Sequence, residues 1–185
     1  MTGVTQLIQN YQKFIKLEWK RNLPGCQKVL FAIYPPVDER KIRAQLLQFK
    51  IATLDANRTW YHIDISSEPA RFISNHEYAQ SYFESPDAVE SLEEDIRNHI
   101  AYIIKEQLLV SDIDENSVVA VTGVSSLFGF THISPIVSMV DGSIKGRLLI
   151  FFPGIYEKGQ YRFMDARTGF DYMAIPITCD DGGFS

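Results

Sequence analysis

The chain has 185 residues, a length at which a single core buries roughly 70% of the surface that the unfolded chain exposes. Hydrophobic residues make up 45% and charged residues 22% of it, which excludes general disorder. The formal net charge of -5 gives no support for a sequence-independent hold on nucleic acid, because such binding needs clustered Lys and Arg. We expect one domain over 1–185 and no direct nucleic-acid partner.

The cysteines and the N-terminus indicate the compartment. Cys26 and Cys179 stand far apart in a cysteine-poor chain, which predicts two reduced thiols rather than the framework of a secreted protein. The first residues lack a basic region followed by an apolar stretch, and the chain has no run of 18 apolar residues. We therefore expect a cytoplasmic protein without a membrane partner.

The N-terminal part predicts a helix followed by a buried strand. Apolar residues from Val4 to Ile15 recur at three- and four-residue steps, which predicts an amphipathic helix over 1–22. Residues 28–34 (KVLFAIY) are apolar after the initial lysine, as in a strand buried on both faces, and Pro35-Pro36 ends the run.

A helix and a second strand follow. The acids Asp38 and Glu39 favour a helix N-terminus, and the helical apolar pattern continues to about Asn57. A strand is predicted over 60–65 and one or two short helices over 66–84.

The second half begins with a clear helix signal. Ser85-Pro86-Asp87 is typical of an N-cap and first turn. The later predicted elements are strand 117–121, a helix around 135–140, strand 147–152, a turn at Pro153-Gly154, strands over 161–164 and 172–177, and a flexible tail over 180–185.

This order predicts an α/β fold. Uniformly apolar strands that alternate with helices indicate a mainly parallel central sheet of about five or six strands flanked by helices. The connections between the last strands are too short for a crossover helix, so an antiparallel edge strand is expected near the C-terminus.

An α/β sheet places ligands beyond the carboxyl ends of its strands, and the loop after strand 117–121 offers two candidate sites. Its glycines, Gly123 and Gly129, suggest an anion-binding turn, yet the lysine of a phosphate-binding loop is missing. Ser125 follows a strand as a hydrolase nucleophile would, with His132 and Asp165 as nominal triad partners. However, position 127 is Leu where the nucleophile elbow needs Gly.

A metal site has even less support. His62 and Asp64 project from the same side of a strand, but no third ligand has diagnostic spacing. We therefore predict no catalytic residue, no cofactor and no metal.

Aromatic and arginine residues near the C-terminus suggest a surface for protein contacts. Such residues dominate binding hot spots, and we predict that a partner protein contacts Tyr156, Tyr161, Arg162 and Arg167. The alternative is that the arginines pair internally with neighbouring acids and only fix the late strands.

Three motifs in the last third give a family resemblance. They are Val119-Ala-Val-Thr-Gly-Val124 with Leu127-Phe-Gly-Phe130, Arg147-Leu-Leu-Ile-Phe-Phe-Pro-Gly154 with Tyr156, and Tyr161-Arg-Phe-Met-Asp-Ala-Arg167 followed by Tyr172-Met-Ala-Ile-Pro-Ile177. Together they resemble the BrxB family of bacterial BREX phage-exclusion systems, over about 118–177. Thr122, Gly123, Pro153 and Gly154 are the turn residues of these motifs. The chain departs from the family pattern at His132, where an arginine is expected.

The resemblance implies a small accessory protein of an antiviral defence system, without established catalysis of its own. It implies work beside a methyltransferase, an ATPase and the alkaline-phosphatase-like protein PglZ, and a PglZ-like subunit is the expected partner. We therefore expect a non-enzymatic adaptor. The alternative is a nucleotide-binding enzyme or sensor with a degenerate phosphate-binding loop after strand 117–121.

Overall fold

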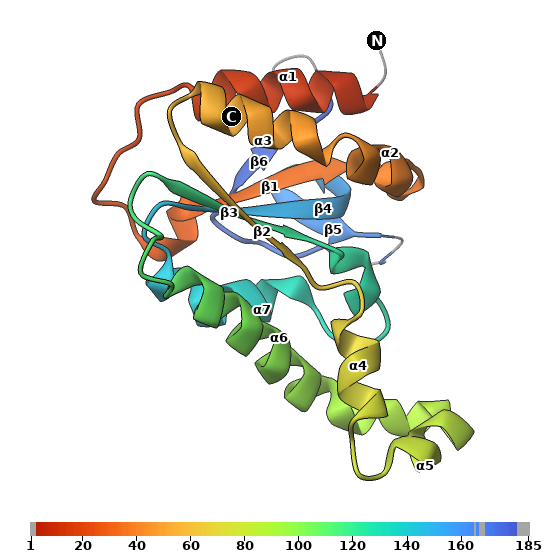
Figure 1. The fold of residues 1–185 in the computed structure, drawn as a ribbon. Coiled ribbons are helices and arrows are strands. Elements are labelled where there is room, and N and C mark those ends of the chain that lie inside the picture. The colour runs from red at the N-terminus through yellow and green to blue at the C-terminus, as the bar shows by residue number, and fades with distance from the viewer. Residues whose placement is uncertain (1–2, 165, 167–168, 181–185) are drawn as a thin grey trace.

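The structure is a computed structural model that describes residues 3–164, 166 and 169–180. Its centre is a sheet in the order β2-β3-β4-β1-β6, with every neighbouring pair parallel (Figure 1). The fifth strand, β5, pairs antiparallel with the end of β4. The strands are β1 (Val29–Tyr34), β2 (Thr59–Asp64), β3 (Ser117–Thr122), β4 (Arg147–Glu157), β5 (Gln160–Phe163) and β6 (Ile175–Ile177). The predicted α/β fold, with its mainly parallel sheet and antiparallel edge strand, is confirmed.

Helices cover both faces of the sheet, as its apolar central strands require (Figure 1). Helices α1 (Gly3–Ile15) and α3 (Leu46–Asp55) lie on one face, and α6 (Glu93–Leu108) and α7 (Ile133–Val140) on the other. The remaining helices are α2 (Glu39–Ala44), α4 (Glu68–Ser74) and α5 (Ala79–Glu84), with short 3-10 helices η1 (Gly25–Lys28), η2 (Pro36–Asp38), η3 (Pro86–Leu92), η4 (Val124–Leu127) and η5 (Asp141–Ser143).

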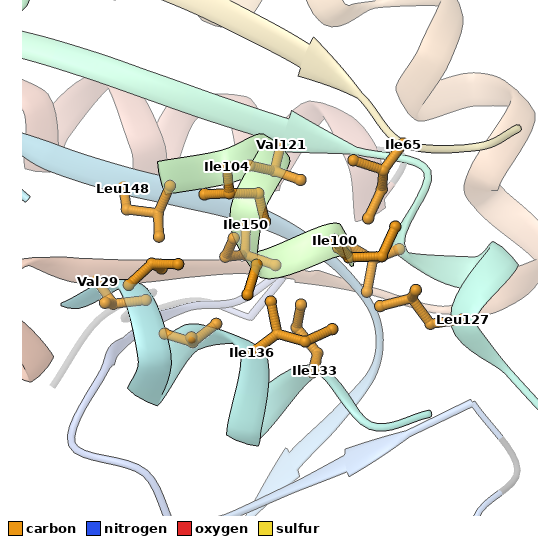
Figure 2. Close-up of a cluster of buried hydrophobic side chains, with 14 of the residues drawn as sticks. Val29, Ile65, Ile100, Ile104, Val121, Leu127, Ile133, Ile136, Leu148 and Ile150 are labelled. Carbon is orange, nitrogen blue, oxygen red and sulfur yellow. The ribbon is translucent and has the colours of Figure 1, made fainter. Parts of the chain in front are cut away.

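Each face has its own apolar core, because successive strand residues point to opposite faces. In β1, Leu30, Ala32 and Tyr34 belong to the core under α1 and α3. Val29, Phe31 and Ile33 belong to the larger core under α6 and α7. Figure 2 shows side chains from the strands, α6 and α7 meeting in this larger core.

Two helix predictions need correction. The N-terminal helix ends at Ile15, not near residue 22, and Trp19 in the following loop stacks on Arg58, which precedes β2. The helix predicted to run to Asn57 is interrupted at Gln45, whose N–H closes α2 on the carbonyls of Lys41 and Ile42.

The predicted turn at Pro153-Gly154 is also wrong, since β4 continues through both residues to Glu157. Pro153 lies opposite Tyr34 of β1, and its carbonyl accepts a hydrogen bond from the N–H of Met164. A Cβ at position 154 would lie 2.2 Å from the Arg162 carbonyl oxygen, so glycine permits the close pairing of β4 with β5.

The last two predicted elements differ in extent. The strand expected over 172–177 is confined to β6. The tail predicted over 180–185 lies mostly outside the described residues, and the Asp180 carbonyl accepts a hydrogen bond from Asn10 Nδ2 at 2.9 Å.

Candidate functional site

A polar cluster occupies the carboxyl ends of β1 and β2, where the fold places a ligand site. We call Tyr34, Glu39, Arg43, Asp64 and Ser66 the carboxyl-edge cluster. Arg43 donates to Glu39 Oε1 and Asp64 Oδ2, both at 3.1 Å, and to Ser66 Oγ at 2.6 Å. Tyr34 donates to Glu39 Oε2 at 2.6 Å. The cluster therefore fastens α2 across the ends of two strands.

The charges of this cluster are stabilised by their partners. Burial alone would raise the pKa of Asp64, but hydrogen bonds from the Ser66 side chain, the Ser66 N–H and Arg43 outweigh burial and lower it. Burial, together with the hydrogen bond to Glu39, raises the pKa of Tyr34. Neither shift brings a group toward neutral pH, where a general acid or base works best. The cluster is suited to holding structure rather than to moving protons.

The turn after β3 is packed against this cluster. Gly123 has a φ of 85°, and a Cβ there would lie 2.5 Å from Ser66 N and 2.7 Å from Asp64 Oδ1. Ser126 donates to the Gly123 carbonyl at 2.7 Å. Ser66 and Asp64 fill the space beside Gly123, so the geometry there gives no support to a nucleotide at the loop after β3.

The nominal catalytic and metal residues are not gathered into a site. No hydrogen bond joins Ser125 to His132 among the described residues, and Asp165 lies outside them. His62 Nε2 contacts Thr122 Oγ1 at 2.8 Å. Within the described part of the chain, no three His, Cys, Asp or Glu side chains lie together as a metal site requires.

The four predicted contact residues have different environments. Tyr161 is fully buried, donates to the Ala174 carbonyl at 2.6 Å and lies edge-on to Phe31. Tyr156 is half-buried against the Tyr161 ring, with centroids 4.7 Å apart. Tyr161 therefore offers no surface to a partner in this structure.

Arg162 is partly accessible, with 41% of its side chain exposed. It lies 3.6 Å from Glu157 and lines a hollow of about 200 Å³ on the β4–β5 hairpin. Arg167 lies outside the described residues. Of the four predicted contact residues, Arg162 and Tyr156 are thus the two whose described side chains are partly accessible.

A larger exposed apolar surface lies elsewhere, on α3. Leu47, Ile51 and Leu54 follow one helix face and are 60%, 40% and 48% exposed. Beside them Trp60 and Lys50 line a hollow of about 480 Å³ between α3 and β2. We call these five residues the α3 surface. Exposed apolar patches of this kind mark contact sites.

The edge of β2 extends the α3 surface. Among the described strands β2 pairs only with β3, so the backbone groups on its outer side are available to another strand. The sequence analysis missed this surface because it used the apolar residues of this segment only to predict a helix. The signal was present, since the apolar positions from Ile42 to Leu54 spread around more of the helix than one buried stripe occupies.

Comparisons with family models, curated proteins and solved structures find no match to this chain. Within the described residues, no helix has the length and apolar character needed to span a membrane.

Proposed function

We propose that the protein is a non-catalytic adaptor of a BREX-like antiviral defence complex that binds a partner protein through the α3 surface. The observation that carries the adaptor role is the exposure of Leu47, Ile51 and Leu54 beside an edge strand. A partner strand added to β2 would form main-chain hydrogen bonds while its side chains cover α3. The BrxB resemblance supplies the defence setting and the PglZ-like partner.

Compared with the α3 surface, the carboxyl-edge cluster is a poor place for a partner to bind. The hydrogen bonds of Arg43 link it to Asp64, Glu39 and Ser66 within the chain. The apolar groups of α3, in comparison, are left in water, where their burial by a partner contributes roughly 25 cal/mol per Å². A contact that buries the α3 surface therefore gains more than one that disrupts the carboxyl-edge cluster.

Co-purification with the products of the neighbouring genes tests the proposal, and the resemblance predicts that a PglZ-like protein is among them. The variant is Leu47→Ser with Ile51→Ser, and the matched control is Leu109→Ser, which changes a 52% exposed leucine at the end of α6. We expect the double variant to fold and lose the partner, while the control retains it. An Arg162→Ala variant tests the β4–β5 hairpin in the same assay.

The outcomes separate the two surfaces. Folded Leu47→Ser/Ile51→Ser protein that still binds its partner would refute the α3 surface. Loss of binding in Arg162→Ala alone would assign the contact to the hairpin. If neither variant nor the wild-type protein binds any product of the neighbouring genes, the adaptor role itself is wrong.

A further inference from the structure

The opposite edge of the sheet, where the strands begin, brings together three residues that are distant in sequence. Arg58 precedes β2 and Arg147 opens β4, and the parallel registers Thr59↔Ser117 and Val118↔Arg147 align their ends. The loop after α1 runs along this edge (Figure 1) and carries Trp19. The Cζ atoms of Arg58 and Arg147 lie 3.7 and 4.6 Å from the Trp19 ring centroid. We call these three residues the amino-edge site.

Arg147 is buried without an acid. It is only 5% exposed, and it donates to the carbonyls of Gly146 at 3.0 Å and Lys20 at 3.4 Å. Among the described ion pairs, none includes Arg147 or Arg58. Buried charges are ordinarily paired, because removing an ion from water costs several kcal/mol. Burial and the neighbouring Arg58 lower the pKa of Arg147 to about 10, so it remains charged at neutral pH.

The unsatisfied polar groups of the site are all donors. The Nε atoms of Arg58 and Arg147 and the Nε1 atom of Trp19 are buried without a hydrogen-bond partner. Native proteins leave few such groups, and here three belong to residues in mutual contact. A ligand that satisfies them must accept hydrogen bonds and carry negative charge.

An adjoining hollow sets the size of that ligand. It has a volume of about 180 Å³ and is lined by Trp19, Arg58 and Asn116 together with the charged residues Glu18, Arg21 and Glu115. This volume corresponds to roughly six water molecules at about 30 Å³ each. Glu115 pairs with Arg21 at 3.7 Å, so the acids at the rim disfavour a long polyanion.

We propose that the amino-edge site binds a single phosphate group, as free inorganic phosphate or as the phosphate of a small monoester. Arg58 and Trp19, which line the hollow, supply the hydrogen bonds, and the guanidinium groups of Arg58 and buried Arg147 supply the charge. This function is independent of the α3 surface. The competing interpretation is that the arginines only stack on Trp19 and fasten the loop after α1.

Tryptophan emission gives a direct test in the full chain. The chain has two tryptophans, so a Trp60→Phe background leaves Trp19 as the reporter. At pH 7.5 and constant ionic strength, inorganic phosphate should change the emission saturably, while sodium chloride should not. Saturating phosphate, at about 100 times its dissociation constant, should also raise the melting temperature by roughly 5–10 °C.

Two variants distinguish donors from general charge. Arg58→Gln should weaken phosphate binding by at least about tenfold, because bonds to charged groups are the strong ones. Arg71→Gln is the control, since Arg71 is 62% exposed on α4 and does not line this hollow, and it should change affinity by less than about threefold. Equal effects of the two variants, or no response of the wild-type protein to phosphate, would overturn the proposal and leave the stacking role.

Further probes show whether the bound phosphate group belongs to the free anion or to a monoester. Tighter binding of glycerol 3-phosphate than of inorganic phosphate assigns a monoester, and the reverse order assigns the free anion. Acetate should bind at least about tenfold more weakly, because one carboxylate satisfies fewer donors. An acetate affinity equal to that of phosphate would overturn the assignment to a phosphate group.

Discussion

Replacing Gly123 by alanine tests how the turn after β3 holds the carboxyl-edge cluster. An L-residue in the left-handed region costs roughly 1–2 kcal/mol. The added Cβ would also lie 2.5 Å from the Ser66 N and Oγ atoms, an overlap relieved only by moving that turn. Moving the turn weakens the two hydrogen bonds that Asp64 accepts, from Ser66 N at 2.9 Å and from Arg43 at 3.1 Å. Each lost bond costs about 1 kcal/mol of unfolding free energy. We expect a total loss of about 3–4 kcal/mol.

Gly129→Ala is the matched control. Its φ is 83°, close to the 85° of Gly123, but a Cβ there would meet no described atom within 4 Å. It should cost only the backbone strain, about 1–2 kcal/mol. Urea unfolding of both variants and of the wild type measures the difference. Equal losses would show that the contact with Ser66 contributes nothing, and that reasoning about the turn would be wrong.

Three further changes probe the cluster and the core. Asp64→Asn should lower the urea midpoint at pH 7, and the difference should shrink as the pH falls below the unfolded pKa of about 3.9. The pKa of Asp64 is lowered in the fold, so its stabilisation is present above the unfolded value and is lost as the pH falls through the folded one. Tyr161→Phe should cost roughly 1–3 kcal/mol of unfolding free energy by leaving the buried Ala174 carbonyl without its donor. Phe152→Ala should cost roughly 3–5 kcal/mol in the same measurement, since this ring is fully buried; a loss under about 1 kcal/mol would contradict the packing.

The order of elements followed from local patterns, whereas their exact ends did not. Six consecutive apolar residues identified β1 as a central strand, and its neighbours on both sides bear this out. Pro153-Gly154 is the counterexample. Proline and glycine are local turn signals, but here pairing with β1 and β5 keeps the chain extended. The interruption at Gln45 had no local signal, because neither proline nor glycine marks it.

The candidate sites depend on contacts that no spacing in the sequence reveals. Trp19, Arg58 and Arg147 come together only because parallel register aligns the beginnings of β2 and β4. Arg43 reaches Asp64 across the helix–strand connection, so a sequence pattern shows two ordinary charged residues. The burial of Tyr161, likewise, depends on Phe31, more than a hundred residues earlier.

The pairing of β1 also sets when the protein can complete its fold during synthesis. Both neighbours of β1, the strands β4 and β6, are translated roughly 110 residues or more after it. At about 5–20 residues per second, this apolar strand leaves the ribosome and waits for many seconds with both edges unpaired. During that interval its exposed apolar edges are prone to aggregation, and it is a candidate segment for chaperone binding. Fragments that stop before β4 keep it permanently in that state, so shortening the chain from its C-terminal side removes both partners of a fully buried strand.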